Sequence, residues 1–149
     1  MAGSTNKGKF RILEKFFRNA DVFNAAMVTS AVAPGPDINT FGELTEIAAG
    51  NGYTAGGLAL TGNATDFDVL TEDDVNDRAF VQTKDLTWTA AGGPLPASGG
   101  GAAKLILTDN NVTIGSREVL LYWDLGGDRQ VTDGQPLTIQ NPEFRLNEV

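Results

Sequence analysis

The stretch that decides the fold class is residues 117–146, REVLLYWDLGGDRQVTDGQPLTIQNPEFRL. Residues 118–125 are apolar at almost every position, which predicts a strand buried on both faces. Leu137, Ile139 and Phe144 stand among polar residues, which favours a second strand covered on one face only. Aspartate and glycine residues between the two supply turn chemistry. The segment therefore predicts a β-rich protein.

The preceding residues add short strands and little helix. Apolar residues at spacings of three and four predict a helix from Lys9 to about Phe23. The run Thr40-Phe41-Gly42-Glu43 matches a capping box and predicts a short helical turn. Further strands are expected over residues 24–32, 53–60, 66–70, 78–89 (with a bulge near Lys84-Asp85) and 104–108, and a flexible loop over 90–102.

These elements predict a mainly β fold, a single antiparallel β-sandwich or jelly-roll-like barrel with a short N-terminal helix and one short internal helical turn. A length of 149 residues favours one domain. We expect residues 1–23 to form an N-terminal arm and helix, and residues 24–149 to form a single β-rich body.

The composition argues against an enzyme. The chain has no cysteine and no histidine, which removes thiol nucleophiles, Ser–His catalysis and the commonest ligands of transition metals. The glycine-rich residues 90–102 lack the Gly-Lys-Ser/Thr ending of a phosphate loop. The acidic run over residues 66–77 could bind Ca²⁺ or serve a carboxylate hydrolase, but a solvated acidic turn is the favoured interpretation. We therefore expect no catalytic residues, cofactor or metal.

Charge is distributed unevenly along the chain, whose net charge is −8. Residues 1–18 hold five basic residues and one acidic residue, whereas the other 131 hold six basic and eighteen acidic residues. An acidic body disfavours nucleic acid as a partner, and no run approaches the roughly 20 apolar residues of a membrane span. We expect no nucleic acid, membrane or small-molecule partner, and the N-terminus lacks the pattern of a signal peptide.

The basic N-terminal segment also carries an apolar stripe, for which two interpretations stay open. The stripe could cap the β-rich body of its own chain, or it could dock on a neighbouring subunit. The docking interpretation predicts a partner interface made by Lys9, Phe10, Arg11, Leu13, Lys15, Phe16, Phe17 and Arg18.

Four sequence pieces, taken in order, carry a resemblance to a known family. They are Ala26–Ser30, residues 44–53 (LTEIAAGNGY), Leu86–Ala90 and Leu120–Ile139. In this order they resemble a family of small tailed-phage virion proteins, encoded among head and tail structural genes, and the resemblance covers about residues 23–146. No catalytic residue comes with it.

The resemblance implies a capsid decoration, or cement, protein, made in the host cytoplasm and located on the capsid surface of the virion. Such a protein would bind the outer surface of the major capsid protein shell and stabilise it, with a homotrimer as the implied state. The alternatives are a neck, tail or adhesin-type subunit, and a carbohydrate-binding module that uses the glycine-rich loops and Trp88. Trp88 and Trp123 are nevertheless more simply interpreted as core anchors.

Overall fold

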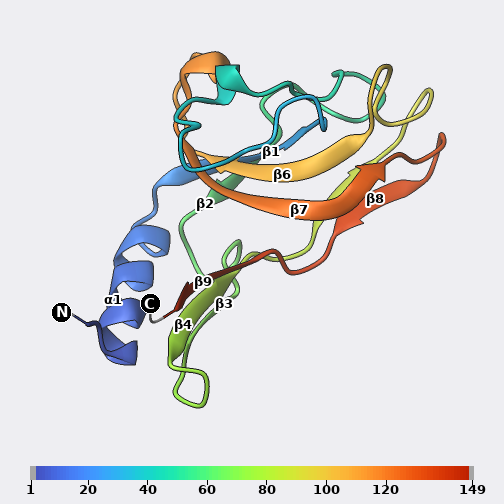
Figure 1. Cartoon of the computed structure of the whole chain (residues 1–149). Helices are drawn as coiled ribbons and strands as arrows, with labels where there is room; N and C mark the ends of the chain where they lie inside the picture. Colours follow the sequence, from blue (N-terminus) through green and yellow to red (C-terminus); the bar gives the residue numbers. More distant parts are fainter. Residues whose placement is uncertain (1–2, 148–149) are drawn as a thin grey trace. The chain divides into compact units, whose positions relative to one another are not determined.

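The computed structural model describes residues 3–147 and is mainly β, with one α-helix near the N-terminus (Figure 1). The pairings β1–β6, β3–β4, β4–β9 and β6–β7 are antiparallel. The predicted antiparallel β class, N-terminal helix and internal helical turn are confirmed, and the arrangement is consistent with a β-sandwich-like fold. The elements are α1 (Asn6–Phe17), β1 (Val22–Val28), η1 (Phe41–Glu43), β2 (Leu58–Thr61), β3 (Val69–Asp73), β4 (Arg78–Gln82), β5 (Leu86–Thr89), β6 (Ala102–Thr108), η2 (Ile114–Ser116), β7 (Val119–Arg129), β8 (Pro136–Ile139) and β9 (Glu143–Asn147).

The chain divides into two compact units, and the division differs from the expected arm and body. In the described chain, unit 1 comprises residues 3–22, 61–86 and 139–147, and unit 2 comprises residues 23–60 and 87–138. The N-terminal helix therefore belongs to a unit completed by two later segments. The β3–β4 hairpin that packs against the helix comes from the range expected to form the separate body.

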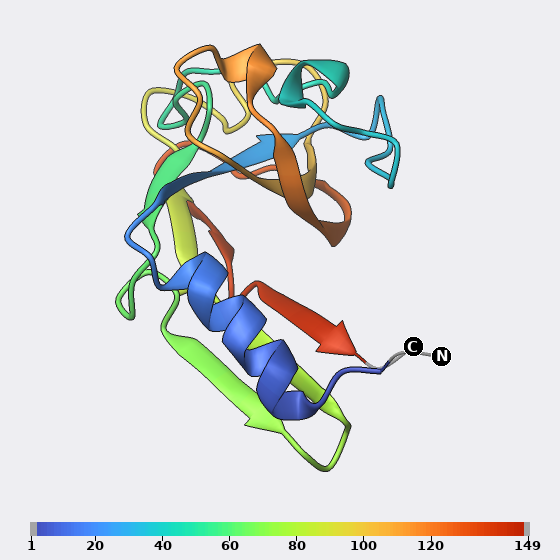
Figure 2. The ribbon, with the colours of Figure 1, turned by 90° about the vertical axis from the view of Figure 1, so that its left-hand side faces the viewer.

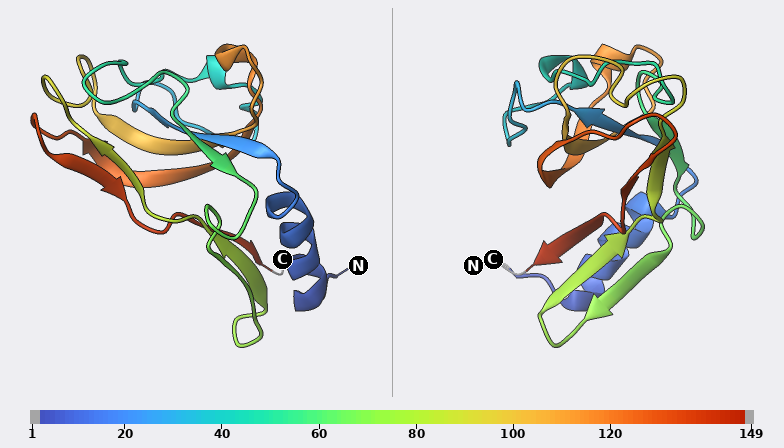
Figure 3. Two further views of the ribbon diagram at one scale, coloured as in Figure 1. Left: turned by 180° about the vertical axis from the view of Figure 1, so that it is seen from behind. Right: turned by 90° about the vertical axis from the view of Figure 1, so that its right-hand side faces the viewer.

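Unit 1 is a helix packed on a three-stranded sheet of order β3-β4-β9. Figure 2 shows α1 lying across this sheet, and the right-hand view of Figure 3 shows the sheet from its other face. Ala79 and Val81 of β4 are buried, while the alternate residues of that strand are half-buried. This period of two is expected of a strand with one covered face.

The helix begins and ends earlier than the apolar spacing predicted. Thr5 caps it by accepting a hydrogen bond from the Gly8 N–H at 3.0 Å, and Phe17 is its last residue. Ala20 has a φ of 67°, in the left-handed region, so the chain cannot continue as a helix there. Strand β1 then starts at Val22, which leaves the predicted helical residues 18–23 outside α1.

Unit 2 is built on a four-stranded sheet of order β2-β1-β6-β7. Its inner strands are buried on both faces: six of the seven residues of β1 are buried, and Ala26 pairs with Ile106 of β6. One face of these strands packs against Phe41, which belongs to the turn η1, and against Leu44, which follows it. The core of the unit therefore lies around β1 and β6.

The strand that decided the fold class is not buried on both faces as predicted. β7 lies at an edge of its sheet with β6 as its strand neighbour, and no residue of β7 is buried. Tyr122 is 49% exposed. The prediction failed because apolar content reports side-chain type, whereas burial depends on the place of the strand in the sheet.

The glycines after this apolar run form an irregularity within β7 and not a turn. Lys104 pairs with Asp124 and Ala102 pairs with Arg129. Two residues along β6 therefore correspond to five residues along β7, and the extra residues of β7 form a bulge. Gly126 has a φ of 73° inside this bulge, a conformation that glycine adopts without a steric penalty. The actual reversal of the chain comes later, within residues 132–135.

The strand predicted over residues 78–89 is two strands in different sheets. β4 pairs with β3 and β9, whereas β5 pairs with β8. Between them, the Thr83 N–H donates to the Pro142 carbonyl and the Lys84 N–H donates to the Asp66 carbonyl. A bulge near Lys84-Asp85 was therefore the wrong interpretation of the break in the pattern.

Two local predictions are confirmed. Glu43 reaches back as a capping box requires, with Oε1 accepting from the Thr40 N–H at 2.7 Å. The loop predicted over residues 90–102 is confirmed as a connection without a regular strand over residues 90–101, whereas Ala102 already belongs to β6. This connection is anchored, because Leu95 is buried and exchanges backbone hydrogen bonds of 3.0 and 2.9 Å with Val131.

Candidate interaction surfaces

The eight residues of the predicted partner interface all lie on α1 or directly after it, but they do not share one face. Three of them, Lys9, Leu13 and Phe17, are buried within the chain's own fold. They recur every four residues and form the stripe that faces the sheet of unit 1. Those three residues are therefore unavailable to a partner. Of the others, Phe10 and Arg18 are half-buried, and Arg11, Lys15 and Phe16 are exposed.

Polar contacts fix α1 to the β3–β4 hairpin. Lys9, only 2% exposed, donates from Nζ to the Asp77 carbonyl at 2.6 Å and to Asn6 Oδ1 at 3.2 Å. Lys7 forms an ion pair with Glu72 at 2.7 Å, and Asn6 donates to Asp74 Oδ1 at 3.0 Å. A buried ammonium group is costly without hydrogen-bond partners. The packing orientation of the helix that gives Lys9 its partners is therefore favoured. The helix is a fixed part of unit 1.

Removing the Lys9 ammonium should destabilise unit 1. In Lys9→Met the stem is kept, but the hydrogen bonds that the buried ammonium donates to Asp77 and Asn6 are lost, so we expect a loss of about 1–3 kcal/mol in the free energy of unfolding. Urea denaturation followed by circular dichroism measures this loss. Lys15→Met, on the exposed face, is the control and should change stability by less than about 0.5 kcal/mol. Equal stabilities for the two variants would contradict this role of Lys9.

The outward side of α1 carries an exposed apolar pair between cations. Ile12 is 58% exposed and Phe16 is 42% exposed. The two are four residues apart and hence neighbours on the helix surface, with Arg11 and Lys15 beside them. We call Arg11, Ile12, Lys15 and Phe16 the outer face of α1. Ile12 was missed from the sequence, although its spacing from Phe16 was the signal that could have found it.

The acidic residues over 66–77 are engaged mainly with the protein itself. Asp66 pairs with Lys84 at 2.5 Å, and Asp73 pairs with Arg78 at 2.7 Å. Hydrogen bonds from the Asn76 side chain and then from Arg78 lower the pKa of the Asp73 carboxyl. Within residues 3–147, no three acidic side chains gather in a way that could hold a metal ion.

A polar network ties the segment after η1 to strand β1. Glu46 Oε1 accepts from the Tyr53 hydroxyl at 2.7 Å and from the Gly56 N–H at 2.6 Å. The Tyr53 oxygen in turn accepts from the Met27 N–H at 3.0 Å, and Arg117 donates to the Gly56 carbonyl at 3.0 Å. Burial, and next the charge of Glu46, raise the pKa of the Tyr53 phenol. The network satisfies buried polar groups and thereby holds this segment in place.

The two tryptophans differ in their surroundings. Trp88 of β5 is buried, with its ring centroid 6.2 Å from that of Tyr53. The interpretation of Trp88 as a core anchor is confirmed, and a buried ring cannot serve as a platform for a sugar. Trp123 is half-buried on the edge strand β7, close to the exposed Tyr122.

Comparisons with models of protein families, with curated proteins and with solved structures found no match for this chain. Within residues 3–147, no helix combines the length and the apolar character needed to cross a membrane.

Proposed function

We propose that this protein is a structural component of a tailed-phage virion, a capsid decoration protein that binds the outer surface of the capsid shell and other copies of itself, as a homotrimer. Its work would be adhesion and not catalysis. The resemblance noted in the sequence supports this proposal, because its four pieces fall almost wholly within one compact unit. They lie on β1, on the segment after η1, on β5 and on β7 to β8, all in unit 2 except the boundary residues Leu86 and Ile139.

The single observation that carries the proposal is Tyr122, an aromatic residue that is 49% exposed within the apolar run of the edge strand β7. Soluble proteins normally protect an edge strand with charges, prolines or a covering loop. The start of β7 is protected, since Glu118 bridges to Thr40 and the Val119 N–H donates to the Asn39 carbonyl at 2.9 Å, and a bulge interrupts its far end. Within the apolar run from Val119 to Trp123, Tyr122 is exposed and the other four residues are half-buried. An exposed aromatic residue on an edge strand of an otherwise acidic chain is suited to contact with a partner.

Tyr122→Lys should weaken binding to the shell while leaving the fold intact. A lysine places a charge on the edge, which must be desolvated when a partner covers it. We expect shell affinity to fall at least about tenfold, a change that costs about 1.4 kcal/mol of binding free energy. Co-sedimentation with expanded shells that lack this protein measures the affinity, and circular dichroism checks the fold.

The matched control is Val32→Lys, because Val32 is another exposed apolar residue of unit 2 but lies in a loop. This variant should bind shells as the wild type does. Failure of the wild-type protein to bind shells would overturn the proposed function. Many copies per native particle would agree with a shell location, whereas a handful of copies would point to the neck or tail.

A further inference from the structure

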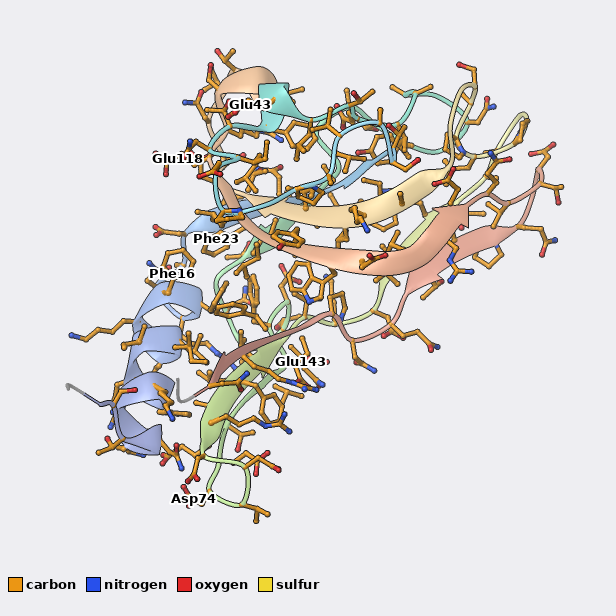
Figure 4. The ribbon with its side chains drawn as sticks, viewed as in Figure 1. Phe16, Phe23, Glu43, Asp74, Glu118 and Glu143 are labelled. Carbon is orange, nitrogen blue, oxygen red and sulfur yellow. The ribbon has the colours of Figure 1, made fainter. Side chains whose placement is uncertain are left out.

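Asn51 and Gly52 are the one asparagine–glycine pair in the sequence, and they form a tight turn of unit 2. Gly50 and Tyr53 flank the pair and exchange backbone hydrogen bonds of 2.8 and 3.1 Å. Asn51 has a φ of 51° and Gly52 a φ of 96°, as a type I′ turn requires, and asparagine followed by glycine is preferred in that turn. The pair lies in the segment after η1, the turn to which Glu43 in Figure 4 belongs. The fold therefore has a structural reason to place this pair here.

The same pair is chemically labile, because a glycine follows the asparagine amide. When the Gly52 N–H loses its proton to solvent, the nitrogen can attack Asn51 Cγ. The new C–N bond closes a succinimide ring, the Cγ–Nδ2 bond breaks, and the side-chain nitrogen takes up a proton and leaves as ammonia. Water then opens the ring at either carbonyl and gives aspartate or isoaspartate. Glycine has no Cβ to shield the attacking nitrogen, whereas every other asparagine of the chain is followed by a residue that has one.

The folded chain holds the Asn51 amide away from this reaction. Asn51 Nδ2 donates to the Pro94 carbonyl at 2.8 Å, so the amide is bound to the loop that follows β5. A Cβ added to Gly93 would lie 2.6 Å from Asn51 Nδ2, which shows how closely this loop encloses the amide. The Ala91 N–H also donates to the Asn51 carbonyl at 3.1 Å. Ring closure must break the bond to Pro94 and turn Asn51 Cγ toward the Gly52 nitrogen.

The attacking residue is held as well. A Cβ added to Gly52 would lie 2.0 Å from the Thr89 carbonyl oxygen and 3.1 Å from the Thr89 carbonyl carbon, so the turn packs directly on the backbone at the end of β5. Gly52 is nevertheless exposed, so solvent reaches it. The reaction is therefore limited by the opening of these contacts and not by the access of water.

We propose that Asn51 is a site of spontaneous deamidation, whose rate is set by the opening of the loop after β5. The reaction runs in the fraction of molecules in which the Asn51–Pro94 hydrogen bond is broken, so its rate reports a local opening equilibrium. An aspartate at this position cannot donate to the Pro94 carbonyl, and isoaspartate inserts an extra methylene into the backbone of the turn. The modification thus weakens unit 2 irreversibly. The inference does not depend on the proposed function.

The first test compares the full chain in native buffer with the same chain unfolded in guanidinium chloride, both in mildly alkaline solution at one temperature. Peptide mass spectrometry follows the exchange of the Asn51 amide for a carboxyl, and isoaspartate methyltransferase labels the isoaspartate. We expect the unfolded chain to react first at Asn51, and at least about tenfold faster there than the native chain. Equal rates, or a reaction led by another asparagine, would overturn the inference.

The second test releases the amide without changing the reacting pair. In Gly93→Ala the added Cβ overlaps with Asn51 Nδ2, so the amide must leave the Pro94 carbonyl, and native deamidation should accelerate at least about fivefold. Gly92→Ala is the matched control, because both glycines have a positive φ but a Cβ at Gly92 would meet nothing within 4 Å. Circular dichroism checks the fold of both variants. Equal deamidation rates in the two folded variants would contradict the role of the clamp.

The third test examines the product and does not require Gly93→Ala to fold. Asn51→Asp should lower the urea midpoint of the protein, because a carboxylate cannot donate to the Pro94 carbonyl. Asn111→Asp is the control, since Asn111 Oδ1 accepts from the Thr113 N–H at 2.9 Å and aspartate retains that acceptor. Its midpoint should equal that of the wild type. A midpoint for Asn51→Asp that also equals the wild-type value would overturn the proposed weakening of unit 2.

Discussion

Gly57→Ala is expected to prevent unit 2 from folding. Gly57 has a φ of +76°, and an added Cβ would lie 1.9 Å from the Ala25 carbonyl oxygen and 2.6 Å from the Ala26 Cα. Both atoms belong to the backbone of β1, the inner strand of the sheet, so no side-chain rotation can relieve the overlap. We expect a loss of more than about 4 kcal/mol, which is exceptional for a single substitution. Far-UV circular dichroism and urea denaturation measure it.

Gly92→Ala separates this overlap from the cost of the backbone conformation. Gly92 has a similar φ of +83°, but an added Cβ would meet nothing within 4 Å. Its replacement should cost only the roughly 1–2 kcal/mol of placing an L-residue in the left-handed region, and the protein should stay folded. Similar stabilities for the two alanine variants would show that β1 does not pack against Gly57 as described.

Stability should fall steeply in alkaline solution because of Tyr53. Its folded-state pKa is raised above the ordinary value near 10, so its contribution is fully present below that value and is lost as the pH rises further. Each pH unit above about 10 should remove about 1.4 kcal/mol from the free energy of unfolding, until the raised pKa is reached. Urea denaturation at a series of pH values between about 9 and 12 measures the slope.

Two variants isolate this contribution. Tyr53→Phe should be less stable at neutral pH, because the buried Met27 N–H loses its acceptor, but should lack this part of the alkaline slope. In Tyr122→Phe, Tyr53 is the remaining tyrosine of the chain, so tyrosinate absorbance reports on it alone. Absorbance that rises near pH 10 while the protein is still folded would contradict the burial of the Tyr53 phenol.

The candidate surface could be located from sequence only in part. The stripe pattern correctly found the helix, although with different bounds. The pattern could not tell which apolar residues face inward, because the stripe is wide and Lys9 looks like a surface residue. Lys9 is buried because Asp77 offers a carbonyl to it, and that residue is 68 positions away in the sequence. The exposed pair Ile12 and Phe16 emerges only once the inner stripe is assigned.

By itself the sequence determined whatever depends on neighbouring residues: the β-rich class, the helix near the N-terminus, the capping box at Thr40 and Glu43, and most of the loop predicted over residues 90–102. Only the tertiary structure decided that β7 lies at a sheet edge and that residues 78–89 divide between two sheets. Propensity, capping and period act over a few residues, so they can be read locally. The order of strands in a sheet is set by pairings between distant segments, and the side-chain pattern of one strand does not record which neighbour it will find.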